Sequence, residues 1–95
     1  SKKLRGEWRI FRWIRMALVK FPDNFLHLTE EVEEIEVQAS TVRELFYLLK
    51  KKWPGLEGEL ESSSVSIDGY IFQEALIEPL GERSEVFFLP RIEGG

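Results

Sequence analysis

The sequence closes with the segment Glu85-Val86-Phe87-Phe88-Leu89-Pro90-Arg91-Ile92-Glu93-Gly94-Gly95. Its first part, residues 85–90, is a short run of apolar and aromatic residues, which is typical of a buried β-strand. Pro90 ends this strand, because proline has no backbone N–H to donate to a neighbouring strand. Successive side chains of a strand point to opposite faces, so one of Phe87 and Phe88 is expected to face a core and the other is free for a partner. The segment therefore predicts a strand followed by a short tail.

Upstream, a second strand is predicted at residues 13–21. Apolar residues occupy both faces of this segment with period two. They are Ala17, Val19 and Phe21 on one face and Ile14, Met16 and Leu18 on the other. We therefore expect a strand that is largely covered on both faces and that ends at Pro22-Asp23-Asn24. A further strand, antiparallel to it, is expected around Ile35 and Val37 after an apolar loop at residues 25–28.

The strongest local pattern is an amphipathic helix that begins after Thr41. Thr41 and Glu44 form a capping box, whose side chains accept hydrogen bonds from free backbone N–H groups of the first turn. Apolar residues then recur at helical spacing. They are Val42, Leu45, Phe46, Leu49 and Trp53. The lysines at 50–52 suit the negative end of the helix dipole, which explains them without a partner-binding patch. Pro54-Gly55 ends the helix.

The rest of the chain predicts short strands and loops. Residues 56–60 are expected to form a polar connection with two apolar anchors, and the serines at 62–64 a loop. Residues 65–72 are expected to form two short strands around the tight-turn pair Asp68-Gly69. An irregular loop with a short helical turn is expected at residues 76–80. This order of elements predicts an α+β fold, with one helix packed on one face of a single sheet.

Length and composition fit a single domain. The chain has 95 residues, of which 43% are apolar and 32% charged. This is enough for one hydrophobic core and too little for two. We assign residues 13–90 to the domain, residues 1–12 to a basic N-terminal extension, and residues 91–95 to a flexible C-terminal tail that ends in Gly-Gly.

The composition also argues against several function classes. The sequence has no cysteine and a single histidine, His27, so a disulfide, a thiolate zinc site and a cysteine nucleophile are excluded, and no metal site is expected. A net charge of −4 argues against nonspecific nucleic-acid binding, which requires phosphate neutralisation. No apolar run approaches the roughly 18 residues that span a bilayer, so we expect no membrane partner and a cytoplasmic location. No nucleophile–base pair or phosphate-binding loop is recognisable, which favours a carrier over a catalyst.

Three segments share the pattern of one protein family. They are Ala39-Ser40-Thr41-Val42-Arg43-Glu44-Leu45 at the helix entry, Trp53-Pro54-Gly55-Leu56 at the helix exit, and the closing segment quoted above. With them, residues 14–95 resemble the MoaD/ThiS family of ubiquitin-like sulfur carriers, and most of all MoaD, the small subunit of molybdopterin synthase. The resemblance implies a β-grasp fold with a mixed four- to five-stranded sheet. The chain departs from the family at residues 81–85, where the usual Gly-Asp pair is absent.

The resemblance implies that the terminal carboxylate is the reactive group. A ubiquitin-activating-type enzyme would use ATP to adenylate the Gly95 carboxylate, and a sulfur donor would convert it to a thiocarboxylate. The carrier itself would bind no cofactor. Gly94 would keep the tip narrow because glycine has no Cβ, and five extended tail residues give a reach of about 17 Å.

The resemblance also implies a second partner, the large subunit of molybdopterin synthase, which would take sulfur from the tail in molybdenum cofactor biosynthesis. The residues expected to contact partners are Phe87, Phe88, Leu89, Pro90, Arg91 and Ile92. Arg91 is expected either to pair with an acidic or phosphate-bearing channel wall, since a guanidinium suits both, or to remain an exposed tail charge.

Three alternatives stay open at this point. The sulfur could serve thiamine (thiazole) synthesis, tRNA thiolation or cysteine synthesis. The chain could instead be a covalent protein modifier, joined through Gly95 to lysines of target proteins. It could also be a noncovalent β-grasp interaction domain whose terminal glycines are incidental.

Overall fold

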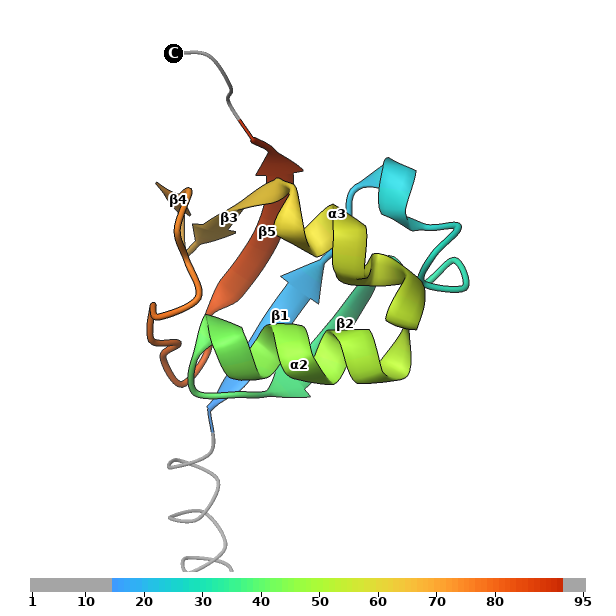
Figure 1. Cartoon of the computed structure of the whole chain (residues 1–95). Coiled ribbons are helices and arrows are strands. Elements are labelled where there is room, and N and C mark those ends of the chain that lie inside the picture. The colour runs from blue at the N-terminus through green and yellow to red at the C-terminus, as the bar shows by residue number, and fades with distance from the viewer. Residues whose placement is uncertain (1–14, 92–95) are drawn as a thin grey trace, which may run out of the picture.

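The computed structural model describes residues 15–91, so the extension 1–12, the first residues of the first expected strand, and residues 92–95 lie outside the described part. Five strands form one mixed sheet in the order β2-β1-β5-β3-β4. They are β1 (Met16–Lys20), β2 (Glu34–Gln38), β3 (Ser63–Ile67), β4 (Tyr70–Phe72) and β5 (Glu85–Pro90). Helix α2 (Val42–Lys52) lies across one face of the sheet, as Figure 1 shows. The predicted α+β fold, with its main helix on one face, is confirmed.

The centre of the sheet is a parallel pair, β1 and β5. β1 pairs with β2 in the antiparallel sense, as predicted, and β5 pairs with β3 in the antiparallel sense. Parallel neighbours need a long connection between them, and here that connection includes β2, α2, β3 and β4. The last strand of the chain is thus inserted beside the first, with neighbours on both sides.

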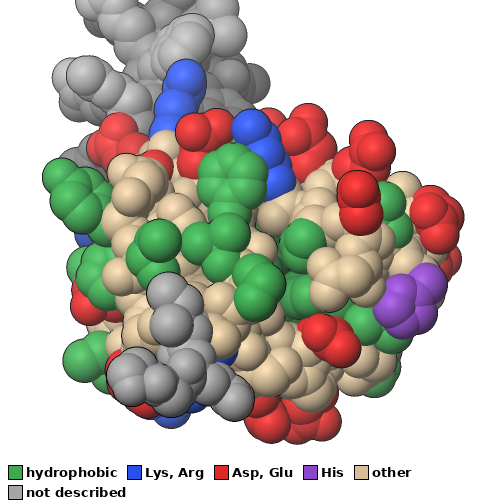
Figure 2. Space-filling model, turned by 90° about the horizontal axis from the view of Figure 1, so that it is seen from above, with side chains coloured by type: hydrophobic (Ala, Val, Ile, Leu, Met, Phe, Trp, Pro, Cys, Tyr) green, Lys and Arg blue, Asp and Glu red, His purple; other side chains and the backbone are tan. Residues whose placement is uncertain are grey.

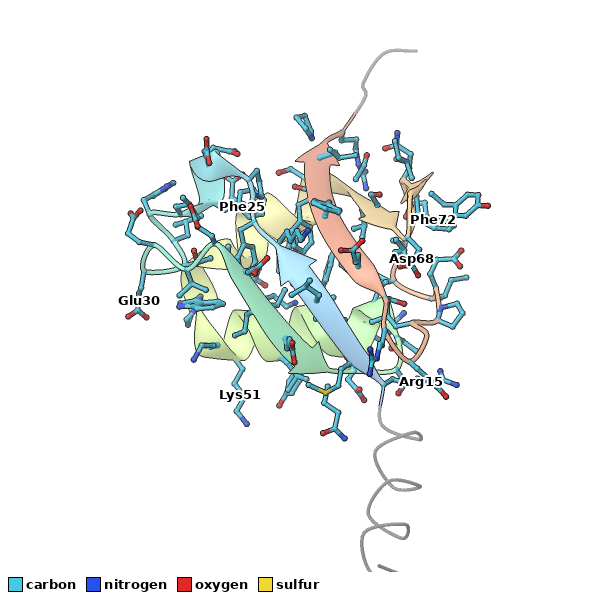
Figure 3. The ribbon with its side chains drawn as sticks, turned by 180° about the vertical axis from the view of Figure 1, so that it is seen from behind. Arg15, Phe25, Glu30, Lys51, Asp68 and Phe72 are labelled. Carbon is cyan, nitrogen blue, oxygen red and sulfur yellow. The ribbon has the colours of Figure 1, made fainter. Side chains whose placement is uncertain are left out.

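The core lies between the sheet and α2. From β1 it takes Ala17 and Val19, and both are fully buried. Met16 and Leu18 point to the other face and are only half-buried. The expected cover on both faces of this strand therefore holds in full for one face only, because no helix of the described residues 15–91 lies over the second face. We call this second face the open face; Figure 3 shows the sheet from that side.

Phe88 sits at the centre of an aromatic cluster. Its ring centroid lies 6.1 Å from that of Phe21, 5.6 Å from that of Phe25 and 5.9 Å from that of Phe46. Trp53 joins through an edge-on contact with Phe21 at 5.7 Å. Aromatic pairs at these separations stabilise a core by more than the apolar area that they bury. The cluster packs β5 and α2 against the segment that follows β1.

The start of α2 is capped as the sequence predicts. The Thr41 Oγ1 accepts a hydrogen bond from the Glu44 N–H at 3.2 Å, and the Glu44 carboxylate accepts one from the Ser40 N–H at 2.9 Å. At the other end, the lysines at 50–52 occupy the last turn, and Trp53 donates its backbone N–H to the Leu49 carbonyl. Both ends of the helix therefore have partners for backbone groups that would otherwise stay free.

Two sequence-based expectations are wrong. Residues 54–61 form a 3-10 turn, η2 (Pro54–Leu56), and a short helix, α3 (Glu57–Glu61), instead of a polar connection. The two apolar anchors, Leu56 and Leu60, are four residues apart, and both are buried because this spacing places them on one helical face. The expected serine loop is also wrong for Ser63 and Ser64, which begin β3 and are buried there.

The β3–β4 hairpin turns at Asp68-Gly69, as predicted. Both residues have positive φ, 50° and 90°, which is the geometry that tight two-residue hairpins require. The Asp68 carboxylate also accepts a hydrogen bond from the backbone N–H of Glu85 at 2.8 Å. The turn, labelled at Asp68 in Figure 3, therefore fixes the start of β5.

A substitution at Glu31 is expected to stabilise the fold. Glu30 and Glu31 both adopt the left-handed conformation, with φ of 55° and 66°. That conformation destabilises the folded state by about 1–2 kcal/mol for a residue with a Cβ, and glycine avoids this strain. Glycine also lowers the free energy of unfolding by about 0.5–1 kcal/mol, because its unfolded chain has more conformational freedom. Glu31→Gly should therefore raise the free energy of unfolding by roughly 0.5–1 kcal/mol in urea titrations. Glu33→Gly, at a position without positive φ, is the control and should lower it.

Candidate functional site at the end of β5

The candidate site begins where β5 ends. β5 is bonded to β1 on one side and to β3 on the other, and Ser63 of β3 is the register partner of Pro90. The sheet therefore fixes the position of the chain up to Pro90. Ile92, Gly94 and Gly95, which the sequence places in the reactive tail, lie outside the described residues. Figure 1 shows the end of β5 at the top of the sheet.

The two phenylalanines of β5 point to opposite faces of the sheet. Phe88 is 3% exposed and belongs to the core, whereas Phe87 points to the open face and is 38% exposed. Leu89 shares the face of Phe87 and is half-buried, and Pro90 is exposed. Of the pair, Phe87 is thus the residue that a partner can reach without unfolding of the chain.

Phe87 has a charged neighbour from β1. The Lys20 ammonium lies 5.2 Å from the centroid of the Phe87 ring, a cation–π arrangement. The same ammonium lies 3.5 Å from the Glu85 carboxylate. Both charged side chains are exposed, so this ion pair adds little to stability. Its effect is local: it holds the Lys20 side chain over one side of the ring.

Apolar residues from three strands gather on the open face. They are Met16 and Leu18 from β1, Phe87 and Leu89 from β5, and Ile71 from β4. Ser64 and Ser66 of β3 lie between β5 and β4 on the same face, and both are buried. Glu34 and Glu36 of β2 flank the apolar residues. Figure 2 looks from above onto the end of β5 and not onto the open face itself; around that end it shows hydrophobic side chains in the middle and acidic ones along much of the rim.

Arg91, the first tail residue, is held by the domain itself. Its Nη2 donates a hydrogen bond to the backbone carbonyl of Gln73 at 2.8 Å. The Gln73 side-chain oxygen in turn accepts a hydrogen bond from the Ser64 hydroxyl at 2.9 Å. The Arg91 Nε is buried, and within the described part of the chain it has no hydrogen-bond partner. Gln73 and Ser64 were missed from the sequence, because a glutamine after a short strand and a serine among serines carry no distinctive signal.

The described residues hold neither of two other kinds of site. Within residues 15–91, no group of three or more His, Cys, Asp or Glu side chains is arranged to hold a metal ion. In the same range, no helix has the length and apolar character needed to cross a membrane.

Comparison with known proteins points to one fold. No protein-family model and no curated protein matches the sequence. Among solved structures, small archaeal modifier protein 1 from Methanosarcina acetivorans matches with a TM-score of 0.71 and 20% identity, over 86% of this chain and 98% of that chain. The BexX/CysO complex of Amycolatopsis orientalis matches with a TM-score of 0.72 and 17% identity, over 83% and 99%. The complex of subunits 1 and 2 of molybdopterin-converting factor from Helicobacter pylori matches with 0.62 and 24%, over 84% and 99%.

The chain is therefore a ubiquitin-like β-grasp domain. More particularly, its fold is the one shared by small archaeal modifier proteins and molybdopterin-converting factor subunits, so the predicted resemblance to the MoaD/ThiS family is confirmed at the level of the fold. The matched chains are covered almost completely, so the similarity extends over the whole domain and not over one motif.

Proposed function

We propose that this protein is a carrier whose C-terminal carboxylate, on Gly95, is activated and loaded with sulfur. The observation that supports it best is the position of β5. This strand is fixed in the centre of the sheet, carries an exposed aromatic residue beside its end, and leads directly into the Gly-Gly segment. The fold supports the same proposal, since known structures with this fold include molybdopterin-converting factor subunits.

The chemistry has two steps. In the partner's active site, the Gly95 carboxylate attacks the α-phosphate of ATP, which gives an acyl-adenylate and releases pyrophosphate. A hydrosulfide ion then attacks the acyl carbon, AMP leaves, and loss of the S–H proton gives the thiocarboxylate. The carrier supplies no catalytic group to either step. Its contribution is the delivery of the terminal carbon through a narrow opening, for which a tip without Cβ atoms is suited.

The docking surface in this proposal is the apolar part of the open face. Phe87 is the central residue, with Leu89 and Pro90 between it and the tail, and Ile92 follows in the tail. Aromatic residues are favoured anchors at protein interfaces, and a partly exposed ring needs little reorganisation before it binds. The first partner is a ubiquitin-activating-type adenylating enzyme, which brings ATP.

For the sulfur acceptor, we propose the large subunit of molybdopterin synthase as second partner. This finer assignment is supported by the sequence pattern at residues 85–95 and by the fold of subunit 1 in the two-subunit complex from Helicobacter pylori. It predicts that the loaded carrier loses its sulfur only when the large subunit and its pterin precursor are both present. Loss to a thiazole precursor or to tRNA would identify another pathway.

The second candidate function is covalent modification of other proteins through Gly95. The fold match to small archaeal modifier protein 1 favours this candidate over other uses of the domain. It would produce higher-mass conjugates that contain this chain linked to lysines, which immunoblots of cell extract would detect. A population of free chain alone would count against it.

Intact-mass spectrometry tests the carrier proposal. The full chain is incubated with ATP, an adenylating enzyme of the ubiquitin-activating type and a sulfur source. We expect one terminal oxygen to be replaced by sulfur, and no change in a variant that lacks Gly95. Tyr47→Ala is the matched control, since this exposed residue lies on α2, away from the open face. Unchanged mass of the parent chain with several adenylating enzymes would contradict the proposal.

A further inference from the structure

Arg91 reaches across a neighbouring strand to find its hydrogen-bond partner. Arg91 follows β5, and Gln73 follows β4, while β3 lies between these two strands in the sheet. Neighbouring strands are about 4.8 Å apart, so the guanidinium spans β3 to reach the Gln73 carbonyl at 2.8 Å. We call this arrangement of Arg91, Gln73 and Ser64 the Arg91 strap.

The residues beneath the strap are small. On the open face, β3 presents Ser64 next to Leu89 of β5, and Gln73 lies beside Ser64 at the end of β4. Ser64 is 1% exposed although it faces away from the helix. A serine leaves room for an arginine stem above it, and long cationic side chains commonly lay their stems over such surfaces. The hydroxyl of Ser64 also holds the Gln73 side chain in place.

The strap does not satisfy all of the guanidinium donors. Its Nε is buried and has no hydrogen-bond partner among the described residues 15–91, and a buried polar group without a partner is costly. An arrangement with this cost persists only when the surrounding contacts hold it. The hydrogen bond to the Gln73 carbonyl is one such contact, so the position of Arg91 depends in part on that bond.

We propose that Arg91 is a positioning residue that fixes the point at which the tail leaves the sheet. This inference rests on the proposed function, because it assigns Arg91 a part in presenting Gly95 to the adenylating enzyme. With the strap closed, the tail starts at residue 92, and four extended residues give a reach of about 14 Å. Residue 91 is then already ordered before docking, so binding to the enzyme does not lose the entropy of ordering it.

The kinetic test uses the adenylating enzyme and measures pyrophosphate release at varied carrier concentration. Arg91→Ala is expected to raise KM by about 5- to 30-fold, which corresponds to the entropy of ordering about one residue, with kcat changed less than about twofold. An unchanged KM would overturn the inference. A kcat that falls as far as kcat/KM would also overturn it, since it would place Arg91 at the reacting atoms.

A double-mutant cycle separates positioning from direct contact with the enzyme. Ser64→Val fills the space beneath the strap without altering Arg91, and should raise KM as Arg91→Ala does. The two changes together should be no worse than either alone, because both open the same strap. Additive effects would show that Arg91 contacts the enzyme directly, and the inference would fail. Arg43→Ala removes an exposed arginine from α2, away from the open face, and is the matched control, with KM within about twofold of the parent.

A structural readout is independent of any enzyme. Because the Arg91 Nε–H is buried, its NMR signal should exchange with water at least about tenfold more slowly than that of exposed Arg43. The protection should disappear in Ser64→Val. Absence of protection in the parent chain overturns the strap even if sulfur loading succeeds. Protection in a chain that no adenylating enzyme activates leaves the strap in place, overturns its role in presentation and contradicts the proposed function.

Discussion

Replacing Phe88 by alanine is expected to cost about 3–5 kcal/mol of the free energy of unfolding, the range for a buried phenylalanine that leaves a cavity. Phe88 is 3% exposed and contacts the rings of Phe21, Phe25 and Phe46. A domain of this size is stable by only about 5–15 kcal/mol, so a large share of its stability depends on this one side chain. The midpoint of urea unfolding, with its slope, measures the effect.

The neighbouring residue gives the matched control. Phe87→Ala removes the same side chain one position earlier, where it is 38% exposed and contacts the Lys20 ammonium. It should cost less than about 1 kcal/mol, because a partly solvated ring leaves no closed cavity. Phe88→Leu keeps most of the volume and should lose roughly 1.5 kcal/mol or less. Equal losses for Phe87→Ala and Phe88→Ala would show that the assignment of the two faces of β5 is wrong.

Under the proposed function, activation by the adenylating enzyme is expected to depend more on Phe87 than on Phe88, which is the reverse of their effects on stability. Phe87→Ala should raise KM for the adenylating enzyme by about 30-fold, the effect of losing an interface anchor worth about 2 kcal/mol. The reason is that Phe87 is the largest side chain on the open face near the tail. Pyrophosphate release at varied carrier concentration measures it, at a temperature where both chains are folded.

Two controls make this result specific. Tyr47→Ala removes another exposed aromatic ring, on the outer side of α2, and should leave KM unchanged. Lys20→Ala removes the ammonium over the ring and should change KM by less than about fivefold, since an exposed cation–π contact contributes only about 0.5–1 kcal/mol. If Tyr47→Ala weakens activation as much as Phe87→Ala, the docking surface lies on the helix side of the molecule.

The parts of the fold that could be predicted from the sequence have short-range signals. Thr41 and Glu44 indicate where the helix starts, Asp68-Gly69 indicates the hairpin turn, and Pro90 indicates the end of the last strand. Each of these depends on residues a few positions apart, so the local sequence contains the whole cause. The two-residue period of a strand predicts that one of Phe87 and Phe88 faces α2, but only the packing of the domain decides which one.

The parts that could not be predicted depend on contacts between distant segments. Helix α3 is only five residues long and contains Gly58, so its local preference is weak, and burial of Leu56 and Leu60 decides its conformation. The buried serines of β3 resemble a loop by composition, yet β5 and β4 pair with them on both sides. The link between Arg91 and Gln73 joins residues 18 positions apart, and a single sequence contains no sign of it.

The central place of β5 has a mechanical consequence. A partner that draws the tail into a channel pulls along the axis of β5, and hydrogen bonds in a sheet lie across the strands. Such a pull loads the bonds to β1 and β3 together, in shear, so that several must break at the same moment. A strand peeled from an edge loses its bonds one at a time and at lower force. Under the proposed function, the tail could therefore be pulled repeatedly, in loading and in release, while the sheet stays intact.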